Sequence, residues 1–142
     1  ENVHAKNVFI KGANSWLKTQ NVGGLIGYTN PATPFEFKEC SVVNITIQAK
    51  GTQIGGMVGS LHKNHTLTKC TANYVSLRVN GSSTTNIAGL VGDIADATGV
   101  KFDKCKVENV EFLKYDGTKN SDYTPTDPLY GKSRSGVPTI VR

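Results

Sequence analysis

A glycine-rich apolar segment that occurs three times at a nearly constant interval constrains this chain more than any other feature of its sequence. It reads Asn-Val-Gly-Gly-Leu-Ile-Gly at 21–27, Ile-Gly-Gly-Met-Val-Gly at 54–59 and Ile-Ala-Gly-Leu-Val-Gly at 87–92. Gly23, Gly55 and Ala88 hold the same place in the three copies, and the two intervals between them differ by a single position. A fixed period of this size indicates a repeat architecture, in which similar units follow one another along the chain.

A second motif keeps a similar period and occurs four times. Its copies begin at residues 3, 40, 70 and 105. Each copy has Cys or Val first, Ala or Val two positions later, Asn or Tyr at the fifth position, and apolar residues at the sixth and eighth. In three copies another apolar residue stands three positions before the cysteine: Phe37, Leu67 and Phe102.

These motifs predict strands. The apolar segments are short, rich in Val, Ile, Thr and Phe, partly alternating, and bounded by Gly, Asn, Thr and Asp. No window has the capped apolar stripe of a helix. The alternation breaks between Phe37 and Cys40 and between Val42 and Ile45, which indicates corners. We therefore predict an all-β fold, a right-handed parallel β-solenoid of about three to four coils, with 30 to 37 residues per coil and roughly three sides.

Stacking predicts which residues lie above one another, because equivalent strands of a parallel solenoid are about 4.8 Å apart. The flanking glycines are expected to allow tight turns at each end of one side of the coil. Two rows are expected on that side. The inner row consists of Leu25, Met57 and Leu90. The other row faces the opposite way, under a polar loop or a second layer, and consists of Ile26, Val58 and Val91. The same stacking predicts an interior ladder of thiols and an asparagine column interrupted by a tyrosine: Cys40, Cys70 and Cys105, then Asn7, Asn44, Tyr74 and Asn109.

The three glycine segments, with a cysteine and a Val-rich strand between them, resemble the GLUG repeat family over about residues 1–112. The resemblance implies a repeat module of secreted or surface-displayed bacterial proteins, often adhesin-like. The chain departs from the family pattern where Asn precedes the Val of the second motif and where Ala88 replaces a glycine. The family supplies no catalytic residue that could be transferred to this chain.

The sequence changes character after residue 112. We divide the chain into a repeat solenoid at 1–112 and a C-terminal cap or linker at 113–142, with little regular structure expected there. We identify no further glycine motif in this region, and residues 137–141 are expected to pair as one edge strand. Its apolar residues offer a surface that docks on the last coil: Leu113, Tyr115, Leu129 and Tyr130.

Charge and cysteine content limit the partners. The net charge is +5, but lysines and arginines are scattered, so they indicate a solvated surface with weak attraction to acidic glycans. A basic stripe with interleaved aromatics is lacking, so no nucleic-acid partner is expected, and no apolar run is long enough for direct membrane insertion. With three cysteines at least one is unpaired, and we expect free thiols. Zinc is not expected, because no Cys-x-x-Cys or histidine partner recurs.

Three clusters carry candidate chemistry. His62 and His65 could chelate a metal, but an exposed turn is the favoured interpretation of the loop. Asp93, Asp96 and Asp103 suggest a calcium loop or an acid/base pair, but the calcium spacing is not matched and loop solvation is favoured. A charged row beside the cysteines is interpreted as solvated: Glu39, Lys69 and Lys104.

We therefore expect no catalytic, cofactor-binding or metal-binding residue. The favoured function is a non-catalytic secreted or cell-surface module, an adhesin-like stalk or binding scaffold. Its partners would be a host or cell-surface glycan or protein and other domains of a larger surface protein. End-to-end stacking of solenoids into fibres could accompany it. The alternative is a polysaccharide lyase or hydrolase, which rests on fold analogy because parallel β-helices often host such enzymes.

Overall fold

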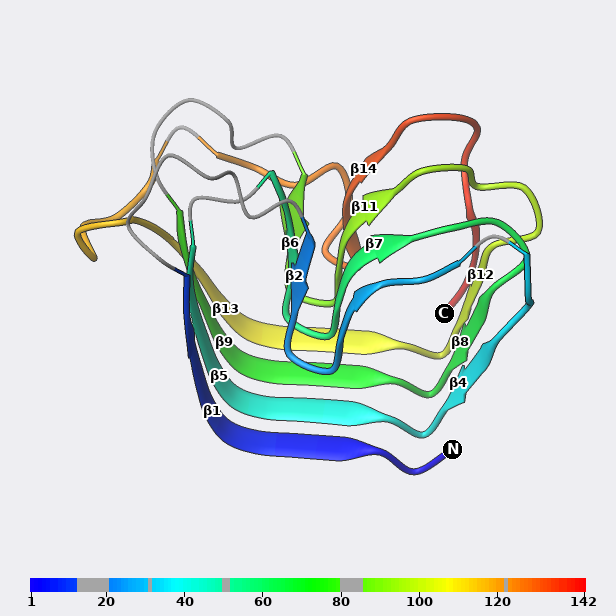
Figure 1. The fold of residues 1–142 in the computed structure, drawn as a ribbon, viewed down its shortest axis with the longest axis horizontal. Helices are drawn as coiled ribbons and strands as arrows, with labels where there is room; N and C mark the ends of the chain where they lie inside the picture. Colours follow the sequence, from blue (N-terminus) through cyan, green and yellow to red (C-terminus); the bar gives the residue numbers. More distant parts are fainter. Residues whose placement is uncertain (13–20, 31, 50–51, 80–85, 122) are drawn as a thin grey trace.

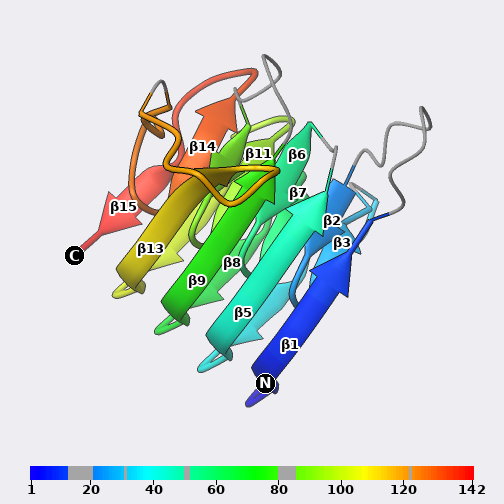
Figure 2. The same cartoon turned by 90° about the vertical axis from the view of Figure 1, so that its left-hand side faces the viewer.

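Four parallel β-sheets run along the molecule, each built from one strand per coil (Figure 1). The computed structural model describes residues 1–12, 21–30, 32–49, 52–79, 86–121 and 123–142, and this part of the chain contains strands but no helix. From β1 onward the chain runs clockwise in Figure 1 while later coils lie farther from the viewer, as Figure 2 makes clear. The fold is a right-handed parallel β-solenoid of about three turns, which confirms the predicted fold class.

The long sheet consists of β1 (His4–Lys11), β5 (Ser41–Ala49), β9 (Thr71–Val79) and β13 (Lys106–Lys114). The first inner sheet consists of β2 (Asn21–Gly23), β6 (Gln53–Gly55) and β10 (Ile87–Ala88). The second inner sheet consists of β3 (Ile26–Tyr28), β7 (Val58–Leu61), β11 (Val91–Ile94) and β14 (Tyr130–Ser133). The side sheet consists of β4 (Glu36–Lys38), β8 (Thr66–Thr68), β12 (Lys101–Asp103) and β15 (Thr139–Val141).

Each glycine motif folds inward, so the expectation of three sides was wrong. A strand of the first inner sheet runs toward the long sheet, and a strand of the second inner sheet returns (Figure 1). At the tip a Cβ on Gly56 would clash with the Gly89 carbonyl oxygen and would lie 3.1 Å from Cγ1 of Val75 on the long sheet. The motif is therefore the bend between two strands and not one straight side of the coil.

The two inner sheets touch backbone to backbone. A Cβ on Gly59 would lie 2.6 Å from the Val22 nitrogen, and one on Gly92 would lie 2.5 Å from the Ile54 nitrogen. Neither glycine has a positive φ. These glycines are therefore needed because they have no side chain where two backbones meet. They are not needed for the conformational freedom in tight turns that the sequence suggested.

The expected corners are confirmed by two columns of residues in the left-handed region. One column, just before Val3 and the three cysteines, has φ between 51° and 55°: Asn2, Glu39, Lys69 and Lys104. The other, within the long sheet, has φ between 52° and 58°: Asn7, Asn44, Tyr74 and Asn109. Each left-handed residue interrupts the two-residue period of side-chain direction, so both apolar runs around it face the core.

The predicted apolar rows stack as expected. Val58 pairs with Ile26 and Val91 in register, and Met57 and Leu90 are fully buried beside them. The side sheet supplies the second layer over the Val58 row. Its Phe102 stacks on Tyr130, which continues that row, with ring centroids 6.1 Å apart.

The region after residue 112 contributes two strands. β15 pairs with β12, as expected for an edge strand at 137–141, and β14 pairs with β11. Gly131 follows Tyr130 in that register and touches Ile87 as Gly92 touches Ile54, so Pro128-Leu129-Tyr130-Gly131 is a fourth glycine motif that the sequence analysis missed.

The Tyr123 hydroxyl bonds to both backbone groups of Ile87, and burial raises the pKa of Tyr123 to about 12.

Substituting a contact glycine is expected to destabilise the fold. Gly92→Ala places a methyl group against the Ile54 backbone, so we expect a loss of about 3 kcal/mol or more in the free energy of unfolding. Gly12→Ala is the matched control, because its Cβ would lie 3.4 Å from Ala49, an ordinary contact. Urea denaturation checks both, and equal stability of the two variants would contradict backbone-to-backbone packing.

A charge in the stacked core is expected to unfold the chain. Leu90→Asp buries a carboxylate without a partner, whereas Asp96→Ala removes a carboxylate from a surface turn. We expect no cooperative melting transition for Leu90→Asp and a transition close to that of the wild type for Asp96→Ala. Circular dichroism melts measure both, and an unchanged transition for Leu90→Asp would count against the stacking.

Candidate functional site

Asp93 is the buried carboxylate of the described part of the chain. Arg134 holds both of its oxygens, with Nε donating to Oδ1 at 3.0 Å and Nη2 lying 2.7 Å from Oδ2. Asn86 Nδ2 donates to Oδ1 at 3.0 Å, and Ser60 Oγ donates to Oδ2 at 3.2 Å. Asp93 therefore ties three successive coils together, and its oxygens are occupied by structural partners.

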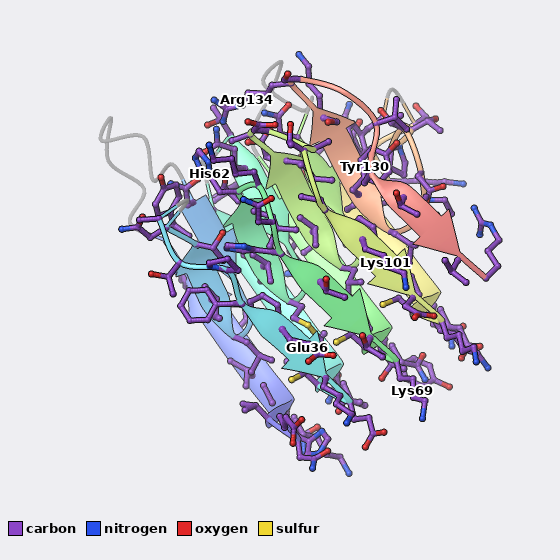
Figure 3. All side chains as sticks on the ribbon, turned by 90° about the vertical axis from the view of Figure 1, so that its right-hand side faces the viewer. Glu36, His62, Lys69, Lys101, Tyr130 and Arg134 are labelled. Carbon is purple, nitrogen blue, oxygen red and sulfur yellow. The ribbon has the colours of Figure 1, made fainter. Side chains whose placement is uncertain are left out.

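Asp96 and Asp103 do not join Asp93. Asp96 accepts a hydrogen bond from the Thr98 backbone nitrogen, and this bond lowers the pKa of Asp96. Asp103 pairs with Lys101 at 3.1 Å on the side sheet. In Figure 3 Lys101 lies on the side sheet, away from Arg134 at the edge of the second inner sheet. Within the described residues no three His, Cys, Asp or Glu side chains are placed to hold a metal ion.

The two histidines of the loop between β7 and β8 have different surroundings. His65 is fully buried and packs edge-on against Phe35, with ring centroids 5.6 Å apart. Its ring nitrogens have no hydrogen-bond partner in the described part of the chain, and burial lowers the pKa of the imidazole. His62 is half-buried and packs edge-on against Tyr28 at 5.5 Å (Figure 3). The interpretation of this loop as an exposed turn is therefore wrong for His65.

The three cysteines form the predicted ladder of free thiols. Cys70 Sγ donates to the Phe37 carbonyl and Cys105 Sγ to the Leu67 carbonyl, both at 3.2 Å, so these two thiols bond to the preceding coil. Cys40 Sγ donates to the Lys38 carbonyl of its own coil at 3.5 Å. Contact with the Cys105 thiol and burial raise the pKa of Cys70 above its usual value. A protonated, hydrogen-bonded thiol is a poor nucleophile, so Cys70, in the middle of the ladder, has a structural role.

The charged row beside the cysteines is solvated, as expected. Lys69 and Glu39 form an ion pair at 3.4 Å, and about half of each side chain is exposed. An exposed pair of this kind contributes little to stability. In Figure 3 Lys69 lies at the rim of the side face, far from His62.

The outer face of the long sheet, by contrast, gathers polar and aromatic side chains. A shallow groove of about 500 Å³ crosses it, lined by Asn44, Thr46, Tyr74, Ser76, Asn109, Glu111 and the edges of two valines. Phe9 and Tyr74 are exposed on this face, at 59% and 61%. Val8 and Ile10 pack against the core, so Phe9 between them points outward.

Tyr74 occupies a strained position. A bulky residue with φ of 53° is an outlier, because its Cβ crowds the backbone in the left-handed region. Such strain costs about 1–3 kcal/mol and is kept where surrounding structure imposes it, often at functional sites. The equivalent residues are asparagines, which tolerate this conformation better. Because the ring is largely exposed, core packing does not account for it.

The N-terminal end of the solenoid has a second groove, of about 490 Å³. Its lining is mainly apolar and includes Val3, Leu25, Ile26, Phe35 and Phe37. Equivalent residues in the next coil are fully buried, whereas Leu25 and Ile26 are half-buried. The opposite end differs, because Pro125 and Pro128 lie beside Val107 and Val110 of β13.

Comparisons with known proteins do not identify the chain. No family model, no curated protein and no solved structure matches it. The resemblance to the GLUG family therefore stays a prediction. Among the described residues there is no helix with the length and hydrophobicity needed to cross a membrane.

Sequence reasoning missed two features of these surfaces. It treated Tyr74 as an interruption of an asparagine column, although a tyrosine at a corner position was already a signal of strain. It also missed the partner of Asp93, because Arg134 lies 41 residues away and outside the repeats recognised from the sequence.

The buried His65 predicts a pH-dependent stability. Its pKa is lower in the folded chain than its ordinary value of 6.5, so the unfolded chain binds the proton more tightly. Stability is therefore full above pH of about 6.5 and falls with decreasing pH, by up to about 1.4 kcal/mol per pH unit. His65→Leu should flatten this dependence in urea titrations between pH 7 and pH 5, and the exposed His4→Gln should not. An unchanged slope in His65→Leu would refute the assignment.

Proposed function

We propose that this chain is a non-catalytic, adhesin-like repeat module of a bacterial secreted or cell-surface protein, and that it serves as a binding scaffold. One observation carries the proposal: two of the three candidate aspartates and the cysteines are committed to structural partners. Asp93 is held by Arg134, Asp103 by Lys101, and the cysteines by backbone carbonyls. The outer face of the long sheet meanwhile presents its side chains in columns.

The long sheet is suited to a binding scaffold. The four strands of the long sheet lie side by side, one from each successive coil (Figure 2). Four stacked strands span only about 15 Å, because each coil adds about 4.8 Å. The long sheet is thus a broad, stiff surface, and such a surface suits ligand presentation.

The alternative, a carbohydrate-active β-helix enzyme, needs paired carboxylates or a base with cation ligands on one face. Glu108 and Glu111 of β13 are both exposed, whereas a carboxyl group that acts as a general acid needs surroundings that keep it protonated, such as an apolar pocket. No observation on the described residues favours this chemistry. The partners we propose are glycans or proteins of a host or cell surface and other domains of a larger surface protein.

Binding without turnover tests the proposal. We expect the purified chain to bind members of a glycan array and to release no reducing ends or unsaturated products from a polysaccharide panel, including after prolonged incubation with calcium. A commercial polysaccharide lyase serves as the positive control for product detection. Catalytic turnover of any polysaccharide would refute the non-catalytic assignment.

A further inference from the structure

Building on the proposed function, we propose that the groove around Tyr74 binds a linear, neutral polysaccharide of equatorially linked pyranoses. The Tyr74 ring stacks on the flat C–H face of one sugar, and neighbouring amide and hydroxyl groups bond to the sugar hydroxyls. The proposal rests on the conformation of Tyr74, the hydrogen bonds that it leaves unmade, and the chemistry of the groove.

The asparagine column shows what Tyr74 displaces. Asn44 Nδ2 donates to Asn7 Oδ1 at 2.7 Å, the first bond of an amide ladder between coils. Tyr74 has no amide to continue it, so Asn44 Oδ1 has no partner within the described residues. Asn109 instead donates at 2.9 Å to Oδ1 of Asn73, the residue next to Tyr74 in the preceding coil. The tyrosine thus interrupts the ladder of side-chain amides. It leaves an exposed ring beside the Asn44 side-chain carbonyl, which accepts no hydrogen bond from the described residues.

The groove lining fits a sugar. Side chains with hydroxyl or amide groups line the groove around the ring: Asn44, Thr46 and Asn109. Such groups match the donors and acceptors of sugar hydroxyls, and a tyrosine ring supplies rigid, amphipathic contact area. Glu111 is the one charged residue among those lining the groove, and its carboxylate disfavours polyanions. The ligand class is therefore neutral.

A second aromatic residue indicates a chain and not a single sugar. Phe9 lies in register with Thr46, and Thr46 with Ser76, so this column runs from the groove to Phe9. Phe9 and Tyr74 belong to coils two levels apart and are offset by two residues along the strand, so their backbone positions are about 12 Å apart. That separation is comparable to two sugar residues of an extended polysaccharide, so the two rings can contact sugars on the same face of one chain.

Affinity gel electrophoresis with mixed-linkage β-glucan, xyloglucan, linear xylan and dextran tests this inference, followed by calorimetry with cellohexaose. We expect retardation by at least one of the β-linked polysaccharides and none by α-linked dextran. Tyr74→Asn should weaken binding by about tenfold or more. The same change should raise Tm by about 2–4 °C, because it relieves the strain and completes the ladder.

Two variants control the experiment. Tyr74→Phe keeps the ring and should retain binding. Tyr28→Asn removes another exposed tyrosine, at 51% against 61% for Tyr74, which lies outside this groove, and it should also retain binding. Wild-type affinity in Tyr74→Asn, or free migration of the wild type through every β-linked gel, would overturn the inference. A fall in Tm of Tyr74→Asn would refute the strain on which it rests. Polysaccharide turnover would instead refute the proposed function, so the two failures are distinguishable.

Discussion

The contact between the two inner sheets is the constraint on which the rest of this fold depends. Packed sheets normally lie about 10 Å apart with side chains between them. Glycines at equivalent levels remove that layer, so the backbone at Gly59 meets Val22 and the backbone at Gly92 meets Ile54. Two strands of each coil can therefore lie in the interior of the solenoid. The bend between them fills space beside the long sheet that side chains alone would otherwise have to fill.

This filled interior decides where function can reside. The buried Asp93 and the thiols of the ladder hold the coils together, since Asp93 bonds to three neighbours and the thiols bond to carbonyls. A ligand therefore meets the outer columns, whose residues repeat at the spacing of the strands. Changing such a column alters the binding surface without altering the glycine contacts, because the two lie on opposite sides of the long sheet's backbone.

The sequence predicted what depends on local pattern. Period and alternation were enough for the strands, the stacking of Met57 on Leu90, the thiol ladder and the corners at Asn44 and its equivalents. The inward bend was not predictable, because the same glycine-rich apolar segment is compatible with a straight side of the coil and with a bend between two strands. Gly131 escaped because it lies farther beyond Gly92 than the period of the other copies, and a proline replaces the preceding motif glycine. Of the candidate site, the sequence showed a tyrosine among asparagines, but not its exposure or the unmade hydrogen bond.

The long sheet also explains how Tyr74 can hold its conformation. Strand β9 pairs in register with β5 on one side and β13 on the other, from Thr71 to Val79. These two ladders fix the backbone on both sides of residue 74, and the buried Val75 and Leu77 anchor it to the core. A local strain of about 1–3 kcal/mol is small beside those contacts. The stacked coils therefore impose a left-handed backbone at residue 74 whichever side chain it carries, and this leaves the side chain free for binding.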